Sequence, residues 1–212
     1  MTAAAAHPRR GAGTALLVVL GLVAFAVLIA LGTWQVQRLQ WKEGLLATID
    51  ARVASDPHSL SDTQARLTTT GDVDYWPISV GGSFRHEGER HFFATHKGQS
   101  GYFVYTPLQL DNGRFILVNR GFVPFDRKDP ATRAQGQVEG WQMVSGLARN
   151  RLSGKPSFLV PDNDLAKNVF YWKDLGAMAA SSGVGSPQDY LPFFIDANDA
   201  PNPGGLPVGG VT

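Results

Sequence analysis

Three histidines, His86, His91 and His96, are the residues of this chain best suited to bind a metal, and they recur at five-residue intervals. In a strand an odd step alternates faces, and in a helix a step of five lies off one face, so neither element gathers all three. A hairpin turning at Glu87-Gly88-Glu89 could bring two of them together on a metal or a haem iron. Because metal ligands normally cluster more tightly, we interpret these histidines as polar residues on the wet face of a hairpin.

Nucleophilic chemistry has weaker support. Ser153 precedes Lys155 by two residues, which could suggest the Ser/Lys pair of a membrane-anchored peptidase, but a Gly-Pro turn explains the same residues. Ser100 is not in a Gly-x-Ser-x-Gly elbow. The absence of cysteine excludes disulfides, thiolate metal sites and covalent Cys-x-x-Cys-His haem attachment. We therefore predict no catalytic residues and favour a binding or assembly role over an enzyme.

Aromatic and cationic residues recur along one stripe. Trp34, Arg38 and Trp41, followed by Leu45, Thr48 and Arg52, are spaced by four and three residues, which places them on one helical face. Trp and Arg beside an apolar segment are typical of a membrane-interface belt. The alternative is a platform for a flat anionic ligand held partly in the membrane.

The element that must position this stripe is Gly11 to Gln37, 27 residues without a charge. As a helix it would extend about 40 Å, against a bilayer hydrocarbon core of about 30 Å. We predict a transmembrane helix over residues 14–37. Cleavage after Gly32 as a secretory signal is the alternative, and Arg9-Arg10 is a weak match to a twin-arginine signal.

The charges on either side of this segment predict its orientation. Arg9 and Arg10 precede it without any acidic residue, so residues 1–13 are expected in the cytoplasm. Residues 38–56 should extend the helix outward as far as Asp56-Pro57. Residues 57–199 should form a periplasmic β-rich domain, followed by a Gly/Pro-rich, solvent-facing tail over residues 200–212. Since nothing before the span resembles a mitochondrial presequence, we expect a bacterial inner membrane.

The composition of the exposed part limits its function. It carries all 18 acidic and 17 of the 19 basic residues, so it is nearly neutral and lacks the basic face of a nucleic-acid binder. The chain of 212 residues, less its anchor, suits one well-cored domain.

Short runs rich in Val, Ile, Tyr, Phe and Thr predict six strands, at Ile78 to Phe84, Arg90 to His96, Gly101 to Leu110, Arg114 to Val123, Val138 to Arg149 and Leu191 to Ala197. Asp111-Asn112-Gly113 predicts a hairpin turn. Asp174 to Ser182 should form a short helix capped by Asp174, and Ser55 to Gly71 a loop. The expected fold class is membrane-anchored mainly β (α+β), with an antiparallel barrel or sandwich.

Several motifs in this order resemble the surfeit-locus-one (Shy) family of cytochrome c oxidase assembly proteins. The resemblance covers roughly Leu31 to Thr212, and the motifs are Leu31-Gly32-Thr33-Trp34-Gln35, Arg38, Trp41-Lys42, Gly101-Tyr102, Thr106-Pro107-Leu108, Leu117-Val118-Asn119-Arg120-Gly121-Phe122-Val123-Pro124, Phe170-Tyr171-Trp172-Lys173-Asp174, Pro207 and Gly209-Gly210. Each motif alone is weak, but their combination is specific.

The resemblance implies a membrane-bound chaperone that binds or delivers haem A while oxidase subunit I matures. Its partners would be subunit I and other assembly or haem A synthesis proteins. Family members continue into a second span, entered by a histidine implicated in haem binding. This sequence stops at Thr212, so the axial histidine is not in this chain, and either the sequence is truncated or haem ligation is not available to it.

The matched residues also allow a physical interpretation. Arg38 and Lys42 would stand where a propionate of a membrane-embedded haem emerges, and Trp34 and Trp41 could stack on the macrocycle. Arg120 is interpreted as a structural cation, with a grip on a haem propionate as the alternative. The competing hypothesis for the whole chain is a single-span scaffold whose β domain binds a partner membrane protein without a cofactor.

Overall fold

The computed structural model describes residues 10–210, with side chains from residue 13, and it divides into two compact units at residues 50 and 51. The first unit consists of most of helix α1 (Arg10–Val53). A 41-residue part of this helix, Gly13–Val53, is long and apolar enough to cross a membrane. Its side chains from residue 13 to residue 48 are exposed, as expected of a helix whose partner is lipid. The chain is thus a membrane-anchored α+β protein.

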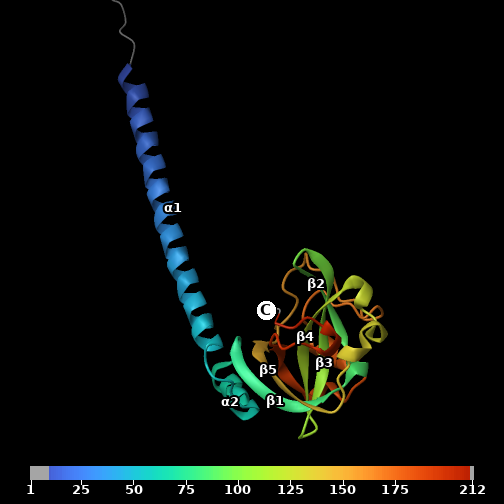
Figure 1. The fold of residues 1–212 in the computed structure, drawn as a ribbon. Helices are drawn as coiled ribbons and strands as arrows, with labels where there is room; N and C mark the ends of the chain where they lie inside the picture. Colours follow the sequence, from blue (N-terminus) through green and yellow to red (C-terminus); the bar gives the residue numbers. More distant parts are fainter. Residues whose placement is uncertain (1–9, 211–212) are drawn as a thin grey trace, which may run out of the picture. The chain divides into compact units, whose positions relative to one another are not determined.

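The second unit contains all six predicted strands (Figure 1). They are β1 (Trp76–Phe84), β2 (Arg90–His96), β3 (Gln99–Leu110), β4 (Phe115–Pro124), β5 (Trp141–Asn150) and β6 (Tyr190–Ala197). Neighbouring strands follow the order β1-β5-β6-β4-β3-β2, and β1 also pairs with β3. Because β1 pairs with both β5 and β3, the strands β1, β5, β6, β4 and β3 close into a barrel. Among the six strands, β2 pairs only with β3 and lies outside this closed ring. Every pair is antiparallel except β4 with β6.

The predicted hairpin joins β3 to β4, with Thr106 opposite Val118 in the register. Its turn requires a left-handed backbone at Gly113, whose φ is 79°. Glycine adopts that angle without strain, which explains why the turn forms there. The hairpin matters for function because it places Arg120, in the middle of β4, inside the second unit.

The sequence prediction for the short helices was half correct. Helix α3 (Leu175–Ser181) is confirmed, and the side chain of Asp174 accepts a hydrogen bond from Ala177 N as its cap. The expected loop over Ser55 to Gly71 is wrong, because most of it is helix α2 (Leu60–Thr70). Ser59 caps its first turn, and Gly71, with φ of 70°, ends it. Several short 3₁₀ helices were also not predicted: η1 (His86–Gly88), η2 (Phe125–Arg127), η3 (Pro130–Gly136), η4 (Pro187–Asp189) and η5 (Pro203–Gly205).

Aliphatic and aromatic side chains fill the barrel. One cluster includes Ile78, Leu108, Ile116 and Phe193, all fully buried. A second, more aromatic cluster packs helix α3 against the strands, with Tyr105, Phe170, Met178 and Phe194 at its centre. These residues stabilise the barrel by removing apolar surface from water, as a chain without disulfides requires.

The C-terminal segment is tied to the barrel more closely than its composition indicates. Val208 and Phe122 exchange two backbone hydrogen bonds, both of 2.8 Å. Pro207 is buried, although most other side chains of residues 200–210 are exposed. The prediction of a solvent-facing tail therefore holds for only part of this segment, because the backbone of Val208 pairs with β4.

Candidate functional site

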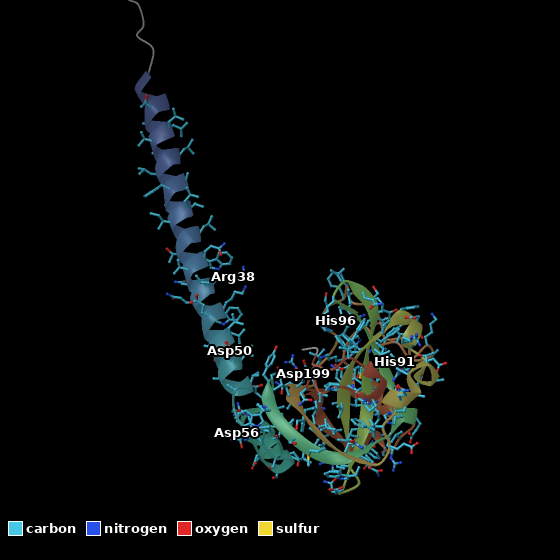
Figure 2. All side chains as sticks on the ribbon, in the orientation of Figure 1. Arg38, Asp50, Asp56, His91, His96 and Asp199 are labelled. Atoms are coloured by element: carbon cyan, nitrogen blue, oxygen red, sulfur yellow. The ribbon has the colours of Figure 1, made fainter. Side chains whose placement is uncertain are left out.

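The predicted stripe on α1 is a row of exposed aromatic and cationic side chains. Trp34 is 49% exposed and Trp41 is 66% exposed. The guanidinium of Arg38 lies 5.3 Å from the centre of the Trp34 ring, as expected for residues four apart on a helix. Lys42 is exposed as well. Figure 2 shows Arg38 projecting from the helix.

This stripe has the chemistry that a flat anion with an apolar face would need. Indole rings offer stacking surface, and a guanidinium and an ammonium can pair with carboxylates. The structure holds Arg38 next to the Trp34 ring, so a cation and a stacking surface are already adjacent. The stripe therefore fits the propionate edge of a haem, although no histidine lies among the described residues of α1 to ligate its iron.

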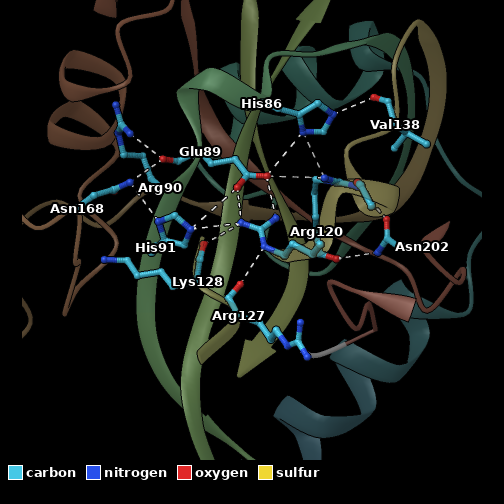
Figure 3. A network of polar contacts seen from close by, with 12 residues as sticks. His86, Glu89, Arg90, His91, Arg120, Arg127, Lys128, Val138, Asn168 and Asn202 are labelled. Atoms are coloured by element: carbon cyan, nitrogen blue, oxygen red, sulfur yellow. Dashed lines mark hydrogen bonds and ion pairs between the residues drawn. The ribbon is translucent and has the colours of Figure 1, made fainter. Parts of the chain in front are cut away.

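A second polar site, which the sequence did not predict, lies inside the β unit (Figure 3). Its centre is Glu89, whose side chain is only 3% exposed. Both carboxylate oxygens accept hydrogen bonds from Arg133, Oε1 at 3.1 Å and Oε2 at 2.5 Å. Nε2 of His91 lies 4.0 Å from Oε2, and Nδ1 of His86 lies 3.6 Å from Oε1. We call these residues, together with Arg120, the Glu89 cluster.

Burial and neighbouring charges shift the pKa values of Glu89 and His91. Burial alone would raise the pKa of Glu89, but contacts with His86 and Arg133 lower it from 4.5 to about 2. Burial lowers the pKa of His91 from 6.5 to about 4, against the attraction of Glu89. Near neutral pH the cluster therefore contains an ionised carboxylate and a neutral His91.

The three histidines do not lie together on a wet face, so that interpretation is wrong. His91 is buried, and its Nδ1 contacts the side-chain nitrogen of Asn168 at 3.1 Å. His96 lies apart from His91 (Figure 2). The centre of its ring is 5.3 Å from that of Phe122. Of the three, His86 and His91 both lie near the carboxylate of Glu89, which already forms an ion pair with Arg133. Within residues 10–210, no three His, Asp or Glu side chains are placed to hold a metal ion.

Arg120 is buried, with 2% of its side chain exposed, and it lies between Glu89 and the C-terminal segment. One nitrogen, Nη2, donates to Gly136 O at 2.6 Å and to Asn202 Oδ1 at 3.0 Å. The other, Nη1, lies 3.9 Å from Glu89 Oε1. These contacts agree with the interpretation of Arg120 as a structural cation, because they join β4, η3 and the C-terminal segment. Burial lowers its pKa from 12.5 to about 10, which leaves it charged.

The remaining candidate positions are engaged in other ways. Lys155 forms a 2.6 Å ion pair with the exposed Asp162, so its amine has a partner other than Ser153. Arg120 belongs to the second unit, whereas Trp34, Arg38, Trp41 and Lys42 belong to the first. The predicted site residues thus form one group on α1 and a separate residue in the β unit.

Comparison with known proteins assigns the family. The SURF1 family model matches residues 22–211. A SURF1-like protein of Monosiga brevicollis is 38% identical over 88% of this chain and 72% of its own length. Surfeit locus protein 1 of Rattus norvegicus is 38% identical over 88% of this chain, and that of Homo sapiens 36% identical over 86%. The match spans 63% of each of these two proteins. The resemblance found in the motifs is confirmed: this chain belongs to the SURF1 family.

Proposed function

We propose that this chain is an assembly factor for haem-copper cytochrome c oxidase that binds or delivers haem A during maturation of subunit I. The observation that carries the proposal is the family match over residues 22–211, because the motifs in this region are those whose resemblance implies this role. An apolar helix supports it, since subunit I matures in a membrane. The partners would be subunit I and the proteins that synthesise haem A.

We assign haem contact to the stripe on α1. Trp34 and Trp41 would contact the macrocycle, and Arg38 and Lys42 would pair with the propionates. Haem A, when bound, supplies the redox group that the oxidase needs, and these side chains would hold it without reacting with it. Arg120 is the second candidate for a propionate contact, and its present partners are groups of its own chain.

We place the protein in a bacterial inner membrane, with its N-terminus in the cytoplasm and the β unit in the periplasm. Arg9 and Arg10 support this orientation because they precede the span without an acidic residue. In this arrangement the stripe on α1 meets the outer lipid headgroups, where haem propionates would emerge.

The test is complementation of a bacterial strain that lacks its own family member. We expect the intact gene to restore the haem a content of the purified oxidase. The double variant Trp34→Ala/Arg38→Ala should restore it several-fold less well, whereas Gln40→Ala, on another face of the same helix, should match the parent. Failure of the parent gene to restore the oxidase would contradict the assembly role. Full restoration by the double variant would contradict the assignment of the stripe.

Purification of the same proteins separates haem binding from a scaffold role. With haem A synthesis active, the parent should carry a visible Soret band that the double variant has lost. Restoration of the oxidase without any such band would instead indicate a scaffold that assists assembly without a cofactor.

A further inference from the structure

A cavity of about 340 Å³ opens on the β unit beside Arg120. Its walls come from the end of β1, from the start of β5 and from the segment after β6, at Phe84, Met143 and Asn202. A volume of this size falls at the lower end of the range for small-molecule sites. None of the described residues that line it is acidic.

The charge of this cavity is unbalanced. The Glu89 cluster contains two buried guanidiniums, Arg133 and Arg120, but a single carboxylate. Arg133 engages both oxygens of that carboxylate, and Arg120 comes no nearer than 3.9 Å. The short hydrogen bonds of Arg120 go to neutral oxygens, those of Gly136 and Asn202. Its positive charge is therefore only partly compensated by its neighbours, and because its side chain is 2% exposed, water compensates little of the rest.

The other walls supply apolar surface. The guanidinium of Arg120 lies 4.8 Å from the centre of the Phe84 ring. Met143 is 60% exposed although it is a large apolar side chain, and it lines the same cavity. Asn198 adds an exposed amide at the rim. One cation beside an aromatic ring and an exposed thioether matches a ligand with a carboxylate at one end and an apolar body at the other.

We propose that this cavity binds a small amphipathic carboxylate, whose charge pairs with Arg120 and whose apolar part contacts Phe84 and Met143. Asn202 links this ligand to the C-terminal segment, because its side chain contacts both Arg120 and Pro207 O. The proposal does not depend on a role in oxidase assembly. The carboxylate could belong to a free acid or to the propionate edge of a haem, and both would present the same group to Arg120.

The test uses the full chain in nanodiscs of zwitterionic lipid, with 1-pyrenebutyrate as a fluorescent probe and empty nanodiscs as the blank. We expect the acid to bind saturably. The matched alcohol, 1-pyrenebutanol, should bind at least about tenfold more weakly. Met143→Glu should weaken binding of the acid by about tenfold, since it adds a like charge at the rim. Met143→Gln removes the apolar contact but adds no charge, so it should weaken binding of the acid less than Met143→Glu does. Because Met143 is exposed, both variants should fold.

Competition then distinguishes the two sources of the carboxylate. Displacement of the probe by octanoate alone indicates a free acid. Displacement by haemin, but not by its dimethyl ester, indicates a propionate. Either result supports the site. Absence of saturable binding, equal binding of acid and alcohol, or equal affinity of the Met143→Glu and Met143→Gln variants would overturn it.

Discussion

Replacement of Glu89 by glutamine tests whether the buried ion pair holds the β unit together. The substitution keeps the size of the side chain but removes its charge. Arg133, with 1% of its side chain exposed, would lose its counter-ion, and Arg120, with 2% exposed, would lose the carboxylate 3.9 Å away. Two cations would then remain buried without an anion.

The size of the effect follows from the burial of the ion pair and from the pKa of Glu89. Removal of one partner from a buried ion pair costs about 3–5 kcal/mol. Independently, a carboxylate whose pKa falls from 4.5 to about 2 contributes about 3 kcal/mol at neutral pH. We therefore expect Glu89→Gln to lower the free energy of unfolding by about 3 kcal/mol at pH 7, a large part of the roughly 5–15 kcal/mol typical of a domain.

The assay is urea unfolding of the full chain in detergent, followed by near-UV circular dichroism so that the signal comes from tertiary structure. Glu87→Gln is the matched control, because Glu87 lies two residues away and is exposed. It should change the free energy of unfolding by less than about 0.5 kcal/mol. The double variant Glu89→Gln/Arg133→Gln should lose less than the sum of the two single variants, because the two side chains share one interaction.

A loss below about 1 kcal/mol in Glu89→Gln would refute this reasoning. Additive effects in the double variant would refute it as well, because they would mean that the 2.5 Å contact contributes no coupling.

Three further predictions use the same unfolding assay. The pKa of His91 is about 4 in the fold and 6.5 ordinarily, so between pH 4 and 6.5 the unfolded chain binds more protons than the folded chain. The free energy of unfolding should therefore fall as the pH drops from 6.5 to 4, and a flat profile would contradict this. In Gly121→Ala the new Cβ would lie 2.0 Å from Val208 O at a φ of 120°. We expect the free energy of unfolding to fall by about 2 kcal/mol and proteolysis of the C-terminal segment to become faster. Gly154→Ala is the control and should change neither, because its Cβ would meet open space. Ser59→Ala should cost about 1 kcal/mol by uncapping α2, and no change would show that this cap is dispensable.

The local signals in the sequence were strong where an element depends on its own residues. The apolar run from Gly11 to Gln37 indicated a helix because a long uncharged segment has few other stable states in a bilayer. The strands followed from short β-branched and aromatic runs, and Asn112-Gly113 marked the hairpin because the turn needs a positive φ. Helix α2 could also have been found, since Ser59 precedes Asp62 by three residues and Gly71 ends the segment.

The internal site could not be found in this way. Glu89 and Arg133 are 44 residues apart, and Arg120 and Asn202 are 82 apart. The sequence shows each of them as an ordinary polar residue, and the wrong interpretation of His91 has the same cause.

Sequence alone thus determined an apolar anchor, a row of aromatic and cationic side chains on it, and a β-rich, cysteine-free domain, because these properties follow from residue type and short-range spacing. Tertiary structure decided which charges are buried and paired. The pairing of β2, β3 and β4 brings Glu89 near Arg120, and the return of the C-terminal segment to β4 brings Asn202 to Arg120. The contacts that result keep Glu89 ionised and leave one cation at the wall of the cavity, because the interior stabilises a charge only through the partners that the fold places beside it.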